Sequence, residues 1–423
     1  MVLVSSQMEK SIRGMLQVTI HNFSSFQTKI STINSYLLIL LGFTFPLSVS
    51  IGTAVIGLIL LLWVVEGKFK EKFTIIQHNK ISYAFLAFFL IHLIGLLWSA
   101  DITWGLHIVS KEWRILLLLI LITIAKKEHI QYYLIAFLLA MSLSEVLSYL
   151  IWFGVIPPFQ GATMLNPTPF MSHISYNPFL AFSIFLLIYF IFFIKNSKDN
   201  FSKIISLFFL TTMTINIFIT GGRAGQVGFF VMLALAFILY FKKNILKSAL
   251  LILVVLPAVF FIAYSSSTLF NTRIHEALND IQVVEKNPNT SVGLRMTFAM
   301  NTLQIIKNNP LFGVGTGDFP KEYETVNMQR SPSALPTVNP HNMYLLVLAQ
   351  TGIVGLILML SIFYMQIQSF FKIHDSLAPL RLALPLLFLT IMLSDSYLLG
   401  HHTALLFVYF SAILYKDFSG EKV

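Results

Sequence analysis

The sequence predicts an all-α polytopic membrane protein with about twelve transmembrane helices and one large outer loop that contains helical structure. Of its 423 residues, 56% are hydrophobic and 11% are charged, whereas soluble domains average about 25% charged residues. The chain also contains many apolar runs close to the roughly 20 residues that cross a ~30 Å hydrocarbon core. Helices are the expected spanning element because they satisfy their backbone hydrogen bonds within the segment.

The first part of the chain predicts a lead-in and a hairpin. Residues 1–34 are polar with scattered apolar side chains and lack the apolar run and small-residue cleavage site of a signal peptide. We expect a cytoplasmic or interfacial segment there. The next apolar stretch, Tyr36–Val65, contains Pro46 and Gly52. Both residues interrupt helices, so the stretch predicts two short spans in a tight hairpin.

Ten further apolar runs predict the remaining spans. They lie at about Ile81–Trp98, Ile108–Ala125, Ile130–Phe153, Pro178–Ile194, Ile204–Thr220, Gly225–Phe241, Ile245–Tyr264, Met343–Phe370, Leu380–Leu393 and Leu398–Tyr415. The predicted organisation is therefore transmembrane helices 1–9 in 35–264, an outer loop in 265–342, helices 10–12 in 343–415 and a cytoplasmic tail in 416–423.

The distribution of positive charge predicts the orientation. Alternate connections hold Lys68, Lys70, Lys72, Lys80, Lys126, Lys127, Lys195, Lys198, Lys203, Lys242, Lys243, Lys247, Lys372 and Arg381. The opposite short connections hold only Lys111, Arg114 and Arg223. Cytoplasmic loops carry the excess of Lys and Arg, so both termini are expected in the cytoplasm and 265–342 outside. The net charge of +10 thus reflects topology and does not indicate nucleic acid binding. The absence of cysteine excludes disulfides and thiolate sites.

The outer loop has a predicted helix of its own. Ser291 is a candidate N-cap for a helical pattern that runs to Lys307, and Asn309-Pro310 ends it. A glycine-rich turn follows over residues 313–320. Long loops with internal structure are more often functional than simple linkers, so the candidate chemistry is expected here.

His341 is the candidate base. It follows Pro340 and comes just before the apolar run Met343–Leu348, which places it at the outer mouth of a membrane helix. An imidazole with an ordinary pKa of about 6.5 suits proton abstraction near neutral pH. The alternative is an interfacial histidine that caps the next helix.

Four basic residues could meet an anionic group. Arg223 follows two glycines in the shortest outer connection, and its planar fork suits phosphate oxygens; alternatively it reaches lipid headgroups. Arg295 near the start of the loop helix could add a second guanidinium, or it could be an exposed helix charge. Lys111 and Arg114 could line the same mouth or pair with lipid phosphate.

Two further patterns predict no site. Gly313–Gly317 lacks the preceding strand and the Lys-Ser/Thr ending of a nucleotide-binding P-loop. Asp395 and the pair His401-His402 could suggest a metal, but adjacent histidines point in different directions on a helix. No carboxylate-rich cluster accompanies them, so no metal site is predicted.

The second half of the chain resembles the bacterial O-antigen ligase and polymerase superfamily. The motifs are Gly221-Gly222-Arg223-Ala224, Gly293-Leu294-Arg295, Asn309-Pro310-Leu311-Phe312-Gly313-Val314-Gly315, Pro340-His341-Asn342 and Gly352-Ile353-Val354-Gly355. Two positions depart from the pattern: Gln350 stands where many relatives carry Glu, and Gly222 stands where Ser is frequent. Both weaken assignment to a particular subfamily.

The resemblance implies a glycosyltransferase of the Gram-negative inner membrane with a periplasmic loop. Its donor would be an undecaprenyl-diphosphate-linked glycan, and it would need no metal or cofactor. Ligases transfer the glycan to lipid A-core, polymerases to another lipid-linked repeat, and protein O-oligosaccharyltransferases to Ser or Thr. We favour a ligase because the loop is one moderate block ending in Pro-His-Asn.

The resemblance also implies roles for individual residues. His341 would deprotonate the acceptor, and Arg223 and Arg295 would bind the donor diphosphate. Lys111 and Arg114 are possible phosphate contacts, whereas Asn342, Gly313 and Gly315 would support the site. The competing class is a polytopic lipid or solute transporter, which would carry charges near the bilayer midplane. Most predicted spans lack such charges, although Asp395 and Glu145 keep the alternative open.

Overall fold

The computed structural model describes residues 24–194, 200–283 and 287–418. Within these ranges the regular elements are helices, apart from an isolated bridge between Thr163 and Asn166. Most of the predicted lead-in, Lys195, Lys198 and the last part of the predicted tail lie outside the described residues. The all-helical prediction is confirmed for the described chain.

A first helix occupies 24–44, and the other α-helices follow it along the described chain. They are α2 (Val49–Glu66), α3 (Phe69–His78), α4 (Lys80–Ile94), α5 (Ile102–Glu112), α6 (Leu117–Ile124), α7 (Ile130–Trp152), α8 (His173–Ile188), α9 (Asn200–Ile219), α10 (Arg223–Tyr240), α11 (Ile245–Ser266), α12 (Thr268–Val283), α13 (Ser291–Asn308), α14 (Phe319–Arg330), α15 (Met343–Lys372), α16 (Ala378–Ile391) and α17 (His401–Leu414). Among the described residues, 8 helical segments are long and apolar enough to cross a membrane, and α16 and α17 are shorter apolar helices. A multi-pass membrane protein follows, while the count of twelve spans and the side on which the loop lies stay predictions.

Three regions differ from the sequence prediction. The first helix occupies 24–44, so it begins before Tyr36, and the break falls at the turn around Pro46 while Gly52 lies inside α2. The predicted span Ile108–Ala125 is divided into α5, a short 3-10 segment and α6. The helix α3 was not predicted, because its short amphipathic sequence is too brief and too polar for a span.

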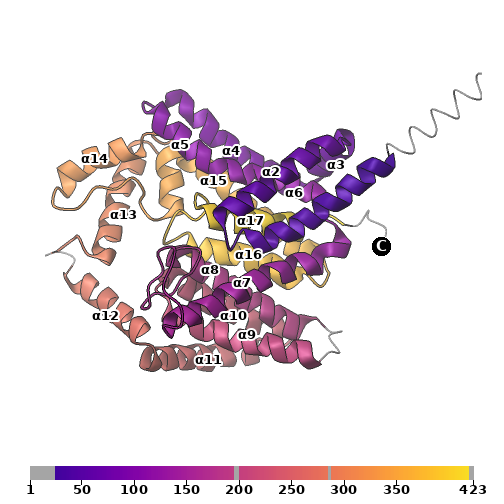
Figure 1. Ribbon diagram of the computed structural model, residues 1–423. Coiled ribbons are helices and arrows are strands. Elements are labelled where there is room, and N and C mark those ends of the chain that lie inside the picture. Colours follow the sequence, from indigo (N-terminus) through magenta and orange to yellow (C-terminus); the bar gives the residue numbers. More distant parts are fainter. Residues whose placement is uncertain (1–23, 195–199, 284–286, 419–423) are drawn as a thin grey trace, which may run out of the picture.

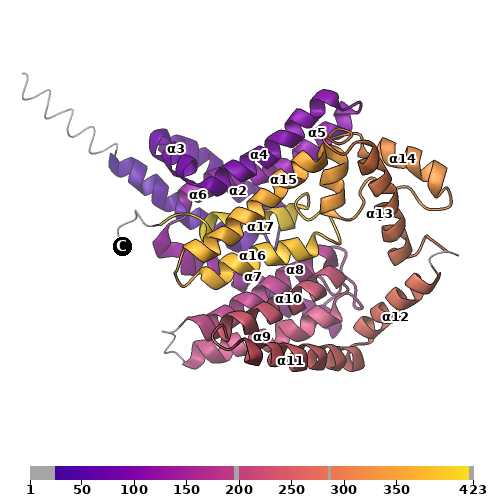
Figure 2. The same ribbon diagram turned by 180° about the vertical axis from the view of Figure 1, so that it is seen from behind.

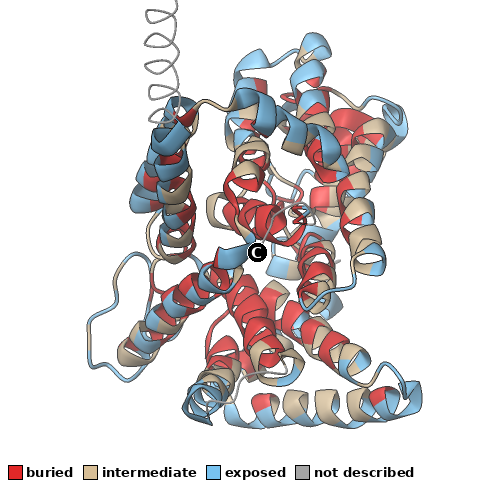
Figure 3. Ribbon diagram, turned by 90° about the vertical axis from the view of Figure 1, so that its right-hand side faces the viewer, coloured by how far each residue is buried: buried red, intermediate tan, exposed pale blue. Residues whose placement is uncertain are grey.

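The helices form two groups on either side of a central layer. Figure 1 shows α15, α16 and α17 between the group from α2 to α6 and the group from α7 to α11, and Figure 2 shows the same order from behind. All fourteen residues of α17 are buried except its first two. By contrast, α11 buries only Ser248 and Ala263 and lies at the periphery. Figure 3 shows this gradient from buried centre to exposed rim.

The loop helices α12, α13 and α14 gather at one end of the bundle (Figure 1). The predicted loop helix is confirmed as α13, although its N-cap is Thr290 and not Ser291, since Thr290 Oγ1 accepts from the Gly293 amide at 3.1 Å. A separate apolar cluster joins the loop to the start of α15. Its members are Phe298, Ile305, Phe319, Tyr323, Val326, Leu346 and Ala349. The loop is therefore a packed part of the molecule.

Candidate active site

His341 is held in an unusual backbone conformation at the start of α15. Its φ is +51°, in the left-handed region that residues other than glycine rarely adopt. The side chain of Asn339 accepts a hydrogen bond from the His341 amide at 3.0 Å. On the other side, Asn342 caps α15 by accepting from the Leu345 amide at 3.1 Å. Strain of this kind persists where the surroundings over-determine the geometry, which happens often at functional sites.

The imidazole of His341 faces a carboxylate that the sequence did not pair with it. Its Nδ1 lies 3.3 Å from Oδ1 of Asp395, and the two side chains are 36% and 18% exposed. The His341 ring also stacks on Phe298 of α13, with ring centres 6.0 Å apart. Because Nδ1 faces the carboxylate, Nε2 is the nitrogen left for a substrate.

Asp395 is fixed by its own hydrogen bonds after the end of α16. Its Oδ1 accepts from the Ser396 amide at 2.7 Å and from Asn339 Nδ2 at 3.3 Å. Burial alone would raise the pKa of Asp395, but His341, the Ser396 amide and the charge of Arg295 together hold that pKa below its ordinary value. The carboxylate is therefore ionised at neutral pH and can stabilise a protonated His341.

Three arginines converge on a pocket of about 350 Å³ that Asp395 also lines. Arg223 at the start of α10 and Arg273 of α12 both contact Glu276, with nitrogen to Oε2 distances of 3.3 Å and 2.9 Å. The third is Arg295 of α13, which donates to Ser291 Oγ at 2.8 Å. We call this the arginine pocket. It brings both predicted arginines together with the partner of His341.

Glycines next to Arg223 allow α10 to approach α8 closely. A Cβ at Gly222 would lie 2.4 Å from the carbonyl oxygen of His173, so no other residue fits without a shift. Asn177, buried in α8, donates to the Gly222 carbonyl at 3.2 Å. Gly221 is held by the side chain of Asn166, which accepts from its amide at 2.9 Å. This packing fixes the position from which Arg223 enters the pocket.

Lys111 lines a second pocket of about 280 Å³ beside the first. We call it the lysine pocket; it also contains Trp104 and Asn339, and it shares Asp395 and Tyr397 with the arginine pocket. The predicted contact Arg114 lines neither pocket. Its Nη1 donates to the backbone carbonyl of Lys111 at 2.9 Å, because the 3-10 turn after α5 directs it back along the chain.

The glycine-rich turn supports the loop. Gly313 and Gly315 have φ of +68° and +114°, and a Cβ at Gly313 would lie 2.4 Å from the backbone of Gln350. The Gly315 amide donates to the Gln350 carbonyl at 3.0 Å. Asp318 then accepts from the amides of Ala100 and Asp101 at 2.8 Å and 2.7 Å, which ties the loop to the connection between α4 and α5.

The described histidines and acidic residues do not form a metal centre. No group of three or more His, Cys, Asp or Glu side chains placed to hold an ion is found among the described residues. His402 instead contacts the Phe45 carbonyl at 3.0 Å through Nδ1.

Asp395, Arg273 and Tyr397 were missed as site residues. The available signal was the polar triplet Ser394-Asp395-Ser396 between two apolar helices, which is unusual for a tight turn inside a membrane bundle. Sequence alone could not pair it with His341, because the contact depends on how α15 and α16 pack.

Residues 207–360 match the family model described as O-antigen ligase. This match confirms the resemblance to the O-antigen ligase and polymerase superfamily over that part of the chain. It includes Arg223, Arg295 and His341 and ends before Asp395. A search of curated proteins finds no match for the chain.

Proposed function

Starting from the likeness of residues 207–360 to the O-antigen ligase family, we propose that this chain is a membrane glycosyltransferase. It transfers a glycan from undecaprenyl diphosphate to lipid A-core on the periplasmic face of the inner membrane. The observation that carries the proposal is the junction of the arginine pocket with the His341–Asp395 pair. Displacement of a diphosphate requires guanidinium groups that bind the phosphate oxygens and a general base that takes the acceptor proton.

The reaction is a single displacement with inversion at the anomeric carbon. The acceptor oxygen bonds to that carbon while the bond from the carbon to the diphosphate oxygen breaks. The electrons of the broken bond leave with undecaprenyl diphosphate, and the acceptor proton moves to Nε2 of His341. Asp395 stabilises the imidazolium that results.

The arginine pocket supplies the charge that the leaving group needs. Among the described residues, Arg223 and Arg273 share the single carboxylate of Glu276, and Arg295 contacts no carboxylate. Fixed guanidinium groups stabilise developing phosphate charge because they are oriented before the reaction begins. We assign the donor diphosphate to this pocket and the acceptor to the adjoining lysine pocket.

An apolar pocket gives the polyprenyl chain a place between helices. It measures about 420 Å³ and lies between α8, α9, α10 and α11. On α10 the lining runs from Phe229, roughly two turns along the helix from Arg223, to Tyr240. We place the lipid tail of a donor bound at Arg223 in this pocket.

Reconstitution tests this function. The purified protein in proteoliposomes receives a defined undecaprenyl-diphosphate-linked glycan and lipid A-core, and transfer is followed by gel mobility with and without chelator. We expect transfer to lipid A-core, unchanged by chelator, with inverted anomeric configuration by NMR. Joining of two lipid-linked glycans would instead identify a polymerase, and transfer to a Ser- or Thr-containing peptide would identify a protein O-oligosaccharyltransferase. Movement of lipid with no new glycosidic bond would identify a transporter.

A further inference from the structure

His173 lines the arginine pocket, and the proposed transfer reaction gives it no role. It is the first residue of α8 and shares the pocket with Arg223, Arg273 and Arg295. The residue is half-buried, and the charges of Arg273 and Arg295 reach its ring. Because the pocket measures only about 350 Å³, a ligand bound to the arginines would meet His173 as well.

The side chain of Asn166 determines which ring nitrogen of His173 carries the proton. Asn166 Oδ1 accepts a hydrogen bond from the Gly221 amide at 2.9 Å. This bond fixes the orientation of the Asn166 amide group, because the reverse orientation would set two hydrogen-bond donors against each other. Asn166 Nδ2 therefore faces His173 Nδ1, at 3.1 Å. An amide nitrogen donates and does not accept, so Nδ1 is the unprotonated nitrogen of a neutral imidazole and the proton lies on Nε2.

Nε2 of His173 is therefore an N–H group that the protein does not use. No described residue accepts a hydrogen bond from it, and it is not one of the polar atoms that are buried without a partner. An imidazolium at this position would add a fourth positive group beside three guanidinium groups. It would also set Nδ1–H against the Asn166 amide. Both effects favour the neutral ring, with an accessible N–H at the arginine pocket.

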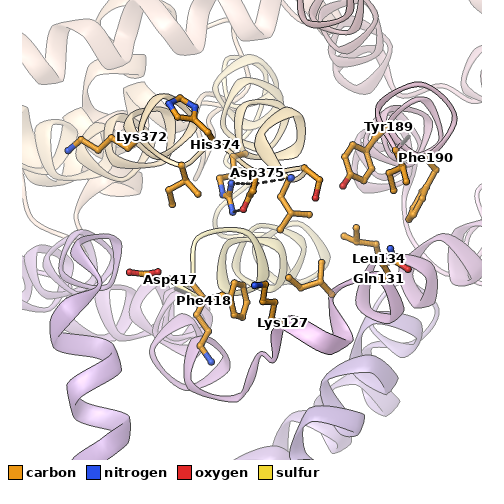
Figure 4. Close-up of a pocket in the computed structure, with 17 residues that line it drawn as sticks. Lys127, Gln131, Leu134, Tyr189, Phe190, Lys372, His374, Asp375, Asp417 and Phe418 are labelled. Atoms are coloured by element: carbon orange, nitrogen blue, oxygen red, sulfur yellow. Dashed lines mark hydrogen bonds and ion pairs between the residues drawn. The ribbon is translucent and has the colours of Figure 1, made fainter. Parts of the chain in front are cut away.

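Cationic groups in a pocket at the other end of the central helices show the contrasting case. This pocket measures about 760 Å³, and Figure 4 shows Asp375 and Lys372, the last residue of α15, among the residues that line it. Arg381 donates to both oxygens of Asp375 at 2.5 Å and 2.8 Å, and Lys416 donates to a backbone carbonyl at 2.5 Å. These bonds support the fold, whereas the Nε2–H group of His173 is left for a ligand.

We propose that His173 binds the diphosphate of the lipid-linked glycan by donating a hydrogen bond from Nε2 to a phosphate oxygen. The inference rests on the proposed function, because it takes the arginine pocket as the diphosphate site. The ring stays neutral and passes no proton to the leaving group, and His341 remains the base. His173 thus adds a directional hydrogen bond to the charge that the arginines supply.

Asn166 positions His173 and the turn before Arg223 together. The same amide group bonds to the His173 ring through Nδ2 and to the Gly221 backbone through Oδ1, and Gly221 lies two residues before Arg223. The imidazole and the start of α10 are therefore held relative to each other before a ligand arrives. Hydrogen-bond donors oriented in advance stabilise phosphate charge without a cost of reorganisation.

Two substitutions at position 173 separate this role from a purely structural one. His173→Gln places an amide nitrogen near the position of Nε2 and keeps the N–H group. His173→Asn places an amide oxygen near the position of Nδ1, so it keeps the acceptor for Asn166 and removes the outer N–H group. Binding of undecaprenyl diphosphate without glycan is measured on the purified full chain in proteoliposomes. We expect His173→Asn to weaken binding by about tenfold or more and His173→Gln to stay within about threefold of the parent protein.

The reverse order would overturn the proposal. If His173→Asn binds undecaprenyl diphosphate as the parent protein does and His173→Gln binds it weakly, the ring serves only as the acceptor for Asn166. Equal weakening in both variants would show that the packing of the ring matters and the N–H group does not.

Glycan transfer by the parent protein tests the proposed function separately. A parent protein that binds undecaprenyl diphosphate with the expected order of variants, yet transfers no glycan, would contradict the transfer reaction and support the hydrogen bond from His173. Transfer by the parent protein, with unchanged diphosphate binding in His173→Asn, would contradict the hydrogen bond and leave the reaction standing.

The protonation of the ring gives a readout that does not depend on transfer. NMR of the full chain labelled in its histidine nitrogens distinguishes protonated from unprotonated ring nitrogens, and the His173 signals are identified by their loss in His173→Gln. We expect a protonated Nε2 and an unprotonated Nδ1 at neutral pH, and a shift of the Nε2 signal when undecaprenyl diphosphate is added. A protonated Nδ1, or an Nε2 signal that bound undecaprenyl diphosphate leaves unchanged, would overturn the proposal.

Discussion

The two ends of the central helices both carry arginine, but the arginines serve different purposes. At the end near His341, the guanidinium groups of Arg223 and Arg273 share one carboxylate and are 31% and 37% exposed. At the opposite end, Arg381 is 1% exposed and is held by both oxygens of Asp375. Glu276 thus leaves part of the positive charge near His341 uncompensated, whereas Asp375 compensates the charge of Arg381.

This difference indicates which arginines can bind a phosphate. A buried charge must be paired, because an unpaired one costs several kcal/mol. The pairing of a buried arginine therefore stabilises the fold and leaves few hydrogen-bond donors for a ligand. Guanidinium groups that outnumber their carboxylates and line a pocket keep donors for a phosphate. We expect substitutions at the two ends to separate into losses of transfer and losses of stability.

The largest effect is expected for His341→Ala. Removal of the base should lower transfer by about 10²- to 10⁴-fold, while the lipid-linked donor accumulates and the protein remains at normal levels in the membrane. Transfer is measured by gel mobility of the glycan product. His275→Ala is the matched control, since His275 lies in the same loop, lines neither the arginine pocket nor the lysine pocket, and has its Nε2 2.8 Å from the Tyr264 hydroxyl. Full transfer by the His341 variant would remove its assigned role.

A smaller loss is expected for Arg295→Lys. The change keeps the positive charge and removes the planar fork, so transfer should fall by about 10²-fold. The control is Arg330→Lys at the end of α14, where the guanidinium donates to Gln304 at 2.9 Å and lines neither pocket. Steady-state rates at several donor concentrations separate binding from turnover. Near-normal transfer would support the alternative that Arg295 is an exposed helix charge.

Asp395→Asn should lower transfer at neutral pH by less than His341→Ala does, because it removes only the group that stabilises the imidazolium and leaves the base in place. Without the carboxylate, the protonated imidazole is less stable, so the decline of the rate in acid should move to lower pH. Stability gives a second readout. Because the pKa of Asp395 is lowered, its stabilising contribution is present above about pH 4 and is lost as the pH falls through its folded value. A rate profile unchanged in shape would argue against the pair.

At the opposite end, Asp375→Ala should change stability and leave the rate per folded molecule unaltered. It leaves Arg381 buried with no carboxylate partner, which should cost about 1–3 kcal/mol after allowance for the partial exposure of Asp375. Thermal unfolding in detergent measures the loss. A fall in turnover with no fall in stability would mean that this end takes part in the reaction.

The sequence predicted the features that depend on local pattern. The loop helix was predicted over Ser291–Lys307 and is observed as Ser291–Asn308, because an N-terminal cap and an Asn-Pro stop are local signals. The meeting of Arg223 with Arg295 in one pocket was also anticipated. The roles assigned to these residues stay predictions until the variants are measured.

Features set by tertiary packing could not be predicted. The pairing of His341 with Asp395 joins residues on either side of α15 and α16, and no spacing rule connects them. The predicted span Ile108–Ala125 included the polar run Ser110-Lys111-Glu112, and the helix divides directly after it, at Trp113–Leu116. The requirement for glycine at position 313 also depends on packing, because a Cβ there would lie 2.4 Å from the backbone of Gln350.

The most direct test of the central claim compares donor binding with transfer in two variants. Binding of the lipid-linked glycan and its transfer to lipid A-core are measured on the same purified proteins in proteoliposomes. If the arginine pocket binds the diphosphate and His341 acts as the base, His341→Ala will bind donor as the parent protein does and fail to transfer it. Arg295→Lys will bind donor more weakly. Loss of donor binding in the His341 variant, with binding retained in the Arg295 variant, would contradict the account.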